Sequence, residues 1–397
     1  CCVVGGGPAG VMLSLLLARQ GVQTVLLESH KDFDREFRGD TIHPSTLEII
    51  DQLGLAARLH ELPHGKLRAL KVHTPAGTTT LVDFHRLKTQ FPYIMMLPQS
   101  RFLGFLATEA QRYPSFRLAF GANVQRLVEE GERVVGVRYR GEDSQWHEVR
   151  APLVVGCDGR FSKLRGLAGL EGAKTSPPMD VVWLRLSRRA NDPVDEGDFY
   201  ISAGHLVVML NREDHWQIGY VVLKGGFPQM RAAGIETLQK SLASIVPWVA
   251  DRVEELHDWK QVSVLSVESS LAPRWYREGL LLIGDAAHVM TPVGGVGINY
   301  AIQDAVETAN LLAGPLKRGQ VSLDDLAAVQ QSRERPTRII QAFQRFMQRQ
   351  IVSNALDDGK PFQFPLVLRL IKRLPILRDI PARMVAFGPR RVRIKEF

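Results

Sequence analysis

Three short motifs, far apart in the chain, combine glycines with residues that can hold phosphates and hydroxyl groups. They are GGGPAG at 5–10, CDGRFSKLR at 157–165 and GDAAHVMTP at 284–292. Glycine turns bring backbone N–H groups close to a bound phosphate, and a nearby carboxylate accepts hydrogen bonds from a sugar. The order and wide spacing of the three motifs predict one dinucleotide site assembled from three distant parts of the chain.

The first motif fits the dinucleotide-binding fingerprint. Gly5 permits a tight turn, Gly7 lets the backbone approach a pyrophosphate, and Gly10 lets the following helix pack closely on the strand. Glu28 lies at the end of the next predicted strand, where a carboxylate accepts both hydroxyls of an adenosine ribose and repels a 2′-phosphate. This motif alone does not separate FAD from NAD.

The third motif favours FAD. Asp285 follows a buried strand, where a short carboxylate can hold a ribityl hydroxyl. Residues 292–297 form a glycine-rich turn that runs into a helix predicted to start near Ile298. The free N–H groups of such a helix start could face the N1–C2=O edge of a flavin, where negative charge develops on reduction.

Alternating strands and helices must position these motifs. Residues 1–28 read as strand, glycine turn, helix and strand, which is a βαβ unit. Further helices are predicted at 44–53 and 99–112, and short buried strands at 153–155 and 280–283 lead into the second and third motifs. The fold class is therefore α/β, with a Rossmann-type (GR2) FAD-binding domain.

A β-rich block interrupts this domain. A hairpin is predicted at 71–84, and strands at 181–223 are followed by a helix at 235–245. We interpret 71–92 and 177–267 as an inserted mixed β-sheet substrate domain. The FAD-binding domain is then discontinuous and comprises 1–70, 93–176 and 268–345, and a helical segment at 346–397 ends the chain.

The C-terminal residues 365–397 carry nine Lys or Arg and two acids among leucines and isoleucines. We interpret them as a helical cover that packs on the domain. A weak contact with a membrane surface is the alternative, although Pro375, Pro381 and Pro389 interrupt any long amphipathic helix.

Composition excludes several other classes of protein. The hydrophobic content of 45% and charged content of 23% are typical of globular proteins, and no apolar run approaches the roughly 18 residues of a membrane span. The net charge is +8, but the basic residues are scattered without a nucleic-acid-binding motif. The three cysteines form no C-x-x-C pair, so neither a zinc site nor a redox dithiol is expected, and we expect a reducing cytoplasm.

With all three motifs present in order, the chain resembles the class A flavoprotein monooxygenases of the para-hydroxybenzoate hydroxylase type. The resemblance covers residues 1 to about 345 and rests on the glycine turn at 5–10, on Asp158-Gly159 and on Gly284-Asp285. It implies a set of FAD-binding residues: Gly5, Gly7, Pro8, Ala9, Gly10, Glu28, Arg38, Gln99, Val124, Asp158, Gly284, Asp285, Pro292, Gly294, Gly295, Gly297, Ile298 and Asn299.

The resemblance also implies the chemistry. NADH or NADPH reduces FAD, O₂ reacts with the reduced flavin, and a flavin C4a-hydroperoxide transfers oxygen to an aromatic or polyketide-like small molecule. Arg38 would lie near the flavin and Pro292 beside its ring. His43, His205 and His288 are the candidates for a general base, with His288 also part of the family motif.

Other functions remain as alternatives. A second glycine fingerprint for NADPH is absent, which argues against Baeyer–Villiger enzymes and disulfide reductases. A reductase or hydroxylase of a lipid or quinone in the same superfamily is the main rival. A non-catalytic nucleotide-binding protein is the distant one. Trp183, Trp216 and Phe199 could line the substrate pocket, or simply pack in the sheet.

Overall fold

A six-stranded sheet links the beginning, the middle and the end of the chain. The computed structural model describes residues 1–34, 40–193, 197–202, 204–212, 214–356, 362–363 and 379–395. The order of the sheet is β20-β21-β12-β1-β2-β8. These strands are β20 (Tyr276–Arg277), β21 (Leu280–Leu282), β12 (Val154–Gly156), β1 (Cys2–Val4), β2 (Thr24–Leu27) and β8 (Phe116–Ala119). All neighbours are parallel except β20 and β21.

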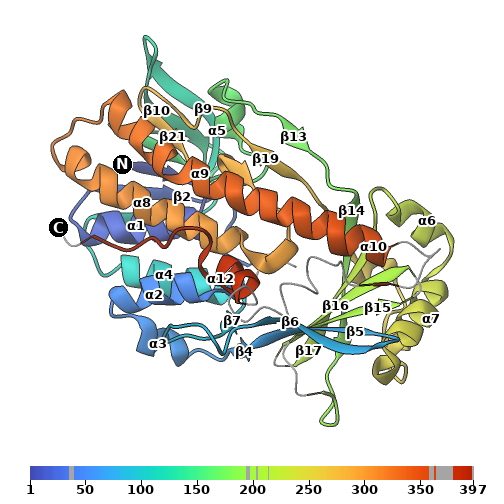
Figure 1. Cartoon of the computed structure of the whole chain (residues 1–397). Helices are drawn as coiled ribbons and strands as arrows, with labels where there is room; N and C mark the ends of the chain where they lie inside the picture. Colours follow the sequence, from blue (N-terminus) through green and yellow to red (C-terminus); the bar gives the residue numbers. More distant parts are fainter. Residues whose placement is uncertain are drawn as a thin grey trace.

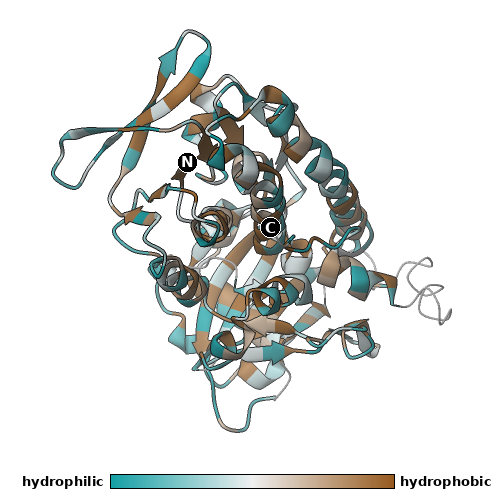
Figure 2. Cartoon of the chain, turned by 90° about the vertical axis from the view of Figure 1, so that its left-hand side faces the viewer, coloured by the Kyte–Doolittle hydropathy of each residue, from teal (hydrophilic) through white to brown (hydrophobic). Residues whose placement is uncertain are grey.

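The central strands of this sheet are apolar along their whole length because both of their faces are covered. The segments CVV of β1, VVG of β12 and LLL of β21 are fully buried, as the strands of a parallel sheet covered on both faces usually are. In Figure 2 the strands next to the N-terminus accordingly appear hydrophobic. Helix α1 (Pro8–Arg19) packs against α4 (Gln99–Ala110) and α8 (Gly297–Lys317).

A second, seven-stranded sheet lies beside the first (Figure 1). Its order is β18-β14-β17-β16-β15-β5-β6. The strands are β18 (Ser263–Ser266), β14 (Met179–Ser187), β17 (His215–Leu223), β16 (His205–Asn211), β15 (Gly197–Ser202), β5 (Ala69–Thr74) and β6 (Gly77–Asp83). The hairpin expected at 71–84 is present as β5 and β6, and β5 joins the sheet by parallel pairing with β15.

The two faces of the seven-stranded sheet differ. Alternate residues of β14 and β17, including Leu184 and Trp216, pack with α7 (Ile235–Ile245) in one apolar cluster. The opposite face, which carries Val181 and Val221, packs in another cluster that includes Val293. This second face is therefore the one turned toward the third motif.

Smaller sheets and helices complete the fold. The sheets are β11-β10-β9, with β9 (Asn123–Glu130), β10 (Arg133–Arg140) and β11 (Trp146–Arg150); β3-β7-β4, with β3 (Thr41–Ile42), β4 (Gly65–Leu67) and β7 (Ile94–Met96); and β13-β19-β22, with β13 (Lys174–Thr175), β19 (Ser269–Leu271) and β22 (His288–Val289). The remaining helices are α2 (Pro44–Gln52), α3 (Ala56–His60), α5 (Lys163–Leu167), α6 (Phe227–Ala232), α9 (Leu323–Met347), α10 (Ser353–Ala355) and α12 (Ile380–Phe387). Single turns of other helix types are η1 (Pro247–Val249), η2 (Val253–Glu255), η3 (Trp259–Gln261), η4 (Gly284–Ala286), η5 (Val293–Gly295) and η6 (Gln348–Val352).

The C-terminal residues cross the outside of the first part of the chain. Helix α12 contacts α2, and the segment 388–395 then runs along α2 and α8 (Figure 1). Asn310 of α8 donates to the carbonyl of Arg393 over 2.8 Å, and its side-chain oxygen accepts from Lys395 N over 3.0 Å. Within the described ranges, no helix combines the length and the apolar character that a bilayer span requires.

Candidate functional site

The three motifs meet at one edge of the six-stranded sheet. Strands β1, β12 and β21 are adjacent and parallel, and each ends directly before one motif. The carboxyl ends of parallel strands lie at the same edge of a sheet, where ligands of open α/β folds bind. Three segments far apart in the sequence are thus brought into one place by the strand order.

The glycines of the first motif are packed closely on the second. A Cβ at Gly5 would lie 2.4 Å from the carbonyl oxygen of Cys157, and one at Gly10 would lie 2.0 Å from the carbonyl oxygen of Gly5. In contrast, a Cβ at Gly7 would meet no atom within 4 Å. Gly7 is also the N-cap of α1, so free N–H groups of the helix start beside this open space. This combination of close packing and local space fits a bound pyrophosphate.

Glu28 is fixed at the end of β2. Its Oε2 accepts from Gly6 N over 2.7 Å, and its Oε1 accepts from His30 N over 2.9 Å. The side chain is thereby held beside the glycine turn, where a ribose of a dinucleotide would lie. Val124 follows shortly after a segment that is held at Glu28: Ala122 N, two residues before Val124, donates to the carbonyl of Glu28 over 2.8 Å.

The second motif connects the other two. Asp158 accepts from the Ser162 hydroxyl over 2.5 Å and from Leu164 N over 3.0 Å, so its carboxylate caps the start of α5. Burial raises the pKa of Asp158, and the hydrogen bond from Ser162 opposes this rise. Arg165, which is buried, donates to the carbonyl of Ala286 over 3.0 Å and so ties α5 to the third motif.

A buried ionic cluster of Asp304, His288 and Arg333, called the Asp304 cluster below, holds the third motif in place. The carboxylate of Asp304 on α8 contacts His288 Nε2 at 2.6 Å and Arg333 Nε of α9 at 2.7 Å. It also accepts from Gly284 N over 3.0 Å. Burial acts to raise the pKa of Asp304, but its contacts with His288 and Arg333 lower it below its usual value. The carboxylate therefore stays ionised.

The loop 292–297 precedes helix α8 and needs its glycines. Gly294 and Gly295 have φ values of +79° and +63°, which residues with a Cβ rarely adopt. Asn299 joins the start of α8 to the start of α2: its Oδ1 accepts from His43 N over 2.9 Å and from the Thr46 hydroxyl over 2.7 Å. The side chain of Asn299 is thus engaged within the protein, and Gly297 and Ile298 start the helix whose N–H groups face the loop.

His43 is fully buried at the start of α2. Its Nδ1 donates to the carbonyl of Val385 in α12 over 2.7 Å. Burial lowers the pKa of His43 to about 4, so the ring is neutral at pH 7. The structure thus places this candidate base between α2 and the C-terminal helix. His205 hydrogen-bonds Tyr220, whose ring belongs to the cluster of the sheet face that packs on α7.

Asp40 joins several segments near the loop. Its Oδ1 accepts from Gln99 N over 3.2 Å at the start of α4, and its carbonyl accepts from Leu97 N over 2.9 Å. The next residue, Thr41, donates through its hydroxyl to the carbonyl of Gly295 over 3.0 Å. Across from these contacts, Asp40 Oδ2 lies 2.6 Å from Arg212 Nη2 of the seven-stranded sheet. Arg38 lies outside the described residues.

The aromatic residues proposed for a substrate pocket separate onto the two faces of the sheet. Trp183 and Phe199 pack with the cluster that includes Val293, next to the third motif. Trp216 is 2% exposed in the cluster with α7, and its indole N–H donates to Asp192 over 2.8 Å. Trp216 is therefore a core residue, whereas Trp183 and Phe199 lie on the face toward the site.

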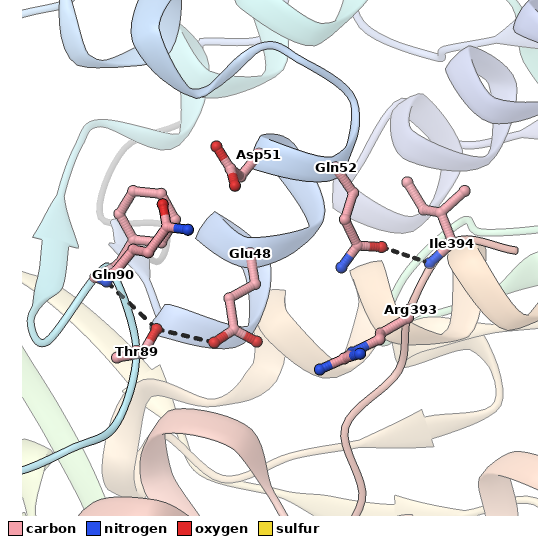
Figure 3. Close-up of a pocket in the computed structure, with 8 residues that line it drawn as sticks. Glu48, Asp51, Gln52, Thr89, Gln90, Arg393 and Ile394 are labelled. Atoms are coloured by element: carbon pink, nitrogen blue, oxygen red, sulfur yellow. Dashed lines mark hydrogen bonds between the residues drawn. The ribbon is translucent and has the colours of Figure 1, made fainter. Parts of the chain in front are cut away.

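A surface pocket elsewhere does not belong to this arrangement. It lies where the C-terminal segment passes α2 and the loop before β7 (Figure 3). Thr89 donates to Glu48 over 2.8 Å, and Ile394 N donates to Gln52 over 2.8 Å. None of the predicted site residues lines this pocket, and its polar groups fasten the C-terminal segment. Among the described residues, no group of three His, Cys, Asp or Glu is placed to bind a metal ion.

Sequence reasoning missed Asp304, Arg333 and Arg212. For Asp304, the only local signal is that an aspartate lies within an apolar stretch of α8. A buried charge there requires a partner. The partner Arg333 lies on the next helix and has no motif of its own. Arg212 pairs with Asp40 across two sheets, and nothing near either residue in the sequence indicates this contact.

Comparison with known proteins agrees with this geometry. A family model described as "FAD binding domain" matches residues 1–342. The chain is 32% identical over 396 residues to 6-methylpretetramide 4-monooxygenase of Streptomyces rimosus, covering 99% of this chain and 93% of that protein. Seven further curated relatives are longer, and the chain spans between 55% and 65% of their length.

Solved structures share the fold. OxyS anhydrotetracycline hydroxylase from Streptomyces rimosus superposes with a TM-score of 0.76 at 24% identity, covering 97% of this chain and 75% of that one. PqsL, a probable FAD-dependent monooxygenase from Pseudomonas aeruginosa, gives a TM-score of 0.75 at 20% identity, covering 90% of this chain and 96% of that one.

Proposed function

Since this chain belongs to the FAD-binding family of flavin-dependent aromatic monooxygenases, we propose that it hydroxylates a fused-ring, polyketide-like aromatic molecule. NAD(P)H and O₂ are the co-substrates typical of the family. In the balanced reaction one oxygen atom of O₂ replaces a hydrogen of the substrate with a hydroxyl group. The other oxygen leaves as water, and NAD(P)H and a proton supply the two electrons and the two hydrogens of that water.

The observation that carries the proposal is the meeting of the three motifs around Gly7. The pyrophosphate of FAD would approach Gly7, where the backbone is open, and the N–H groups of α1 would contact it. Glu28 would accept the ribose hydroxyls and Asp285 a ribityl hydroxyl. We propose the other predicted contacts in the same way, with Val124 acting through its backbone and Asn299 through its main chain.

Bound FAD would supply electron transfer from the nicotinamide and activation of O₂, while the protein positions the reactants and excludes water. Several residues of the chain fix the loop 292–297 and the start of α8, where the flavin would bind. The first turn of α8 offers free N–H groups toward the loop 292–297, and Thr41 holds that loop by donating to the carbonyl of Gly295. Val293 packs on the apolar face of the seven-stranded sheet, which keeps water from the reacting end of the site.

We further propose that the sheet part of the chain, 71–92 and 177–267, binds the substrate. Its face with Trp183 and Phe199 is turned toward Val293 and offers flat, apolar contact to an aromatic ring system. The relative that acts on 6-methylpretetramide supports a fused-ring polyketide, because it matches this chain over almost its whole length. The remaining parts, 1–70, 93–176 and 268–345, would bind FAD, and 346–397 would cover them.

A visible spectrum of the purified protein, followed by anaerobic addition of NADH or NADPH, tests the proposal. We expect a yellow protein whose flavin absorbance is bleached faster when a fused-ring phenol is present than when it is absent. Subsequent admission of O₂ should yield the hydroxylated phenol, identified by a mass increase of one oxygen atom.

Two results would contradict the proposal in different ways. A colourless protein that does not take up added FAD would exclude the flavoenzyme. A flavin that is bleached at one rate whatever phenol is present, and that then yields only hydrogen peroxide with O₂, would favour a reductase or another superfamily activity.

A further inference from the structure

Arg212, which directly follows β16, has hydrogen-bonding capacity that the protein does not use. Its side chain is only 9% exposed. Nη2 contacts Asp40 at 2.6 Å, and Nε and Nη2 both donate to Gln217 Oε1, over 3.0 Å and 2.6 Å. The remaining nitrogen, Nη1, is buried without a hydrogen-bond partner in the described part of the chain. A buried cationic N–H group without an acceptor is costly, so this position favours a ligand that supplies one.

The position of Arg212 connects it to the reacting end of the site. Its partner Asp40 precedes Thr41, which donates to the carbonyl of Gly295 in the flavin-facing loop. The same carboxylate accepts from Gln99 N, a second predicted flavin contact. Arg212 thus belongs to the seven-stranded sheet but is fixed to the segments that would surround the flavin.

An aromatic surface adjoins this cationic end of the sheet. Side chains alternate along β14, so Trp183 and Arg185 lie on the same face as Val181, which packs toward Val293. In the register with β17, Trp183 stands opposite Gly219 and Arg185 opposite Gln217. A Cβ at Gly219 would lie 3.0 Å from the indole of Trp183, so this ring lies over Gly219 of the neighbouring strand.

Electrostatics around Asp40 agree with this geometry. Burial raises the pKa of Asp40, and Arg212, Arg185 and His215 oppose that rise. Burial lowers the pKa of Arg212; Asp40 opposes this decrease and Arg185 adds to it. Arg212 is thus the cation in direct contact with the partly buried Asp40 carboxylate, and Arg185 and His215 act on the same carboxylate, although His215 also has Asp214 as a partner at 2.7 Å.

We propose that Arg212 is a specificity-determining residue that binds an ionised oxygen of the substrate, a phenolate or an enolate, through its Nη1. The rings of the substrate then lie along Trp183, and the oxyanion lies at the end of the sheet beside Asp40. This inference rests on the proposed function, since it selects acidic fused-ring phenols among the aromatic substrates. A neutral ether offers Nη1 only an uncharged oxygen as acceptor and therefore binds more weakly.

Binding to the oxidised, FAD-loaded protein tests this inference without NAD(P)H or turnover. The probes are 1,8-dihydroxyanthraquinone and its dimethyl ether, followed by the change in flavin absorbance. We expect the wild type to bind the diol about tenfold or more tightly than the ether, because hydrogen bonds to ionised groups are the strong ones. The visible band of the phenolate should show that the bound diol ionises about one pH unit or more below the free compound.

In R212Q both preferences should disappear, and R212K should retain part of them because it keeps the charge. R212Q leaves the buried Asp40 carboxylate without its partner, so D40N/R212Q is measured beside it. The flavin content of each variant serves as the check of folding. R138Q is the matched control, since Arg138 is a 48% exposed arginine in another sheet, paired with Glu148.

Three outcomes would overturn the inference. The first is diol preference unchanged in both R212Q and D40N/R212Q. The second is equal or absent binding of diol and ether by the wild type. A separate steady-state assay gives the third: a loss in R212Q that is confined to the KM for NADH or NADPH would assign the guanidinium to a coenzyme phosphate instead. If phenolates bind through Arg212 but are never hydroxylated, the proposed function fails and the inference stands.

Discussion

At the scale of single residues, the glycine turn offers the sharpest test of the cofactor site. Gly7 has a φ of −76°, which alanine adopts without strain, and a Cβ there would meet no protein atom within 4 Å. We therefore expect Gly7→Ala to fold normally and to lose FAD affinity by about a hundredfold or more, because the methyl group occupies the space of the pyrophosphate. Flavin titration followed by fluorescence measures this loss.

Gly104→Ala is the control for this prediction. Gly104 lies within helix α4, where a Cβ would also meet no atom within 4 Å. This variant should bind FAD like the wild type and gain up to about 1 kcal/mol of stability from helix propensity. If Gly7→Ala binds FAD as tightly as Gly104→Ala does, the pyrophosphate does not approach Gly7.

The residues that sequence reasoning could identify are those whose role follows from local chemistry. Gly5 and Gly10 are required because a side chain at either position would collide with a backbone carbonyl. Glu28 is recognised by its place at the end of the second strand of the same βαβ unit. The contact between Asp40 and Arg212 has no such local cause. It depends on how two sheets are placed against each other, which one sequence does not specify.

At the scale of elements, α8 and α9 are joined by the Asp304 cluster. Removing one partner leaves a buried charge without compensation, so Asp304→Asn and Arg333→Met should each lower the free energy of unfolding by about 3–5 kcal/mol. The double variant should cost less than the sum of the two. Urea unfolding followed by circular dichroism measures all three.

A surface ion pair on the same helix provides the comparison. Arg338 contacts Glu334 at 2.6 Å, but the arginine side chain is 62% exposed. Arg338→Met should therefore change stability by at most about 1 kcal/mol. If Arg333→Met lowers the free energy of unfolding no more than Arg338→Met does, the Asp304 cluster does not hold the third motif in place.

The Asp304→Asn variant should also lose affinity for FAD together with its loss of stability, since Gly284 N loses its carboxylate acceptor.

Helices and strands could be predicted from the sequence where the pattern of apolar and polar residues was strong. The helices at 99–112 and 235–245 and the hairpin at 71–84 correspond to α4, α7 and β5–β6. Strand β8 was not anticipated, because FRLA has no clear alternation and its place at the edge of the sheet comes from pairing with β2. Short strands of this kind are specified by their neighbours rather than by their own residues.

At the scale of the whole molecule, a buried ion pair beside the seven-stranded sheet makes stability dependent on pH. Arg252 forms two 2.7 Å contacts with Asp192, and both side chains are almost fully buried. Burial acts to raise the pKa of Asp192, but Arg252 and Trp216 lower it from 3.8 to about 2. A lowered pKa in the folded state contributes stability above the unfolded pKa, and this contribution is lost as the pH falls from about 4 to about 2.

The expected size of this contribution is about 2 kcal/mol. We predict that the stability difference between the wild type and Asp192→Asn is constant from pH 5 to 7 and shrinks by this amount toward pH 2, as measured by urea unfolding. A difference that does not vary with pH would show that Asp192 titrates normally. Asp324→Asn, a change at an exposed carboxylate in the first turn of α9, provides the comparison.

The strand order has a consequence for the making of the protein. The β1 strand at the start of the chain lies beside β12, and β12 lies beside β21 at 280–282. At translation rates of about 5–20 residues per second, the last of these strands leaves the ribosome tens of seconds after the first. A nascent chain therefore carries its glycine turn long before it can retain a flavin. Retention of FAD is therefore expected only after the third motif at 284–292 has been synthesised.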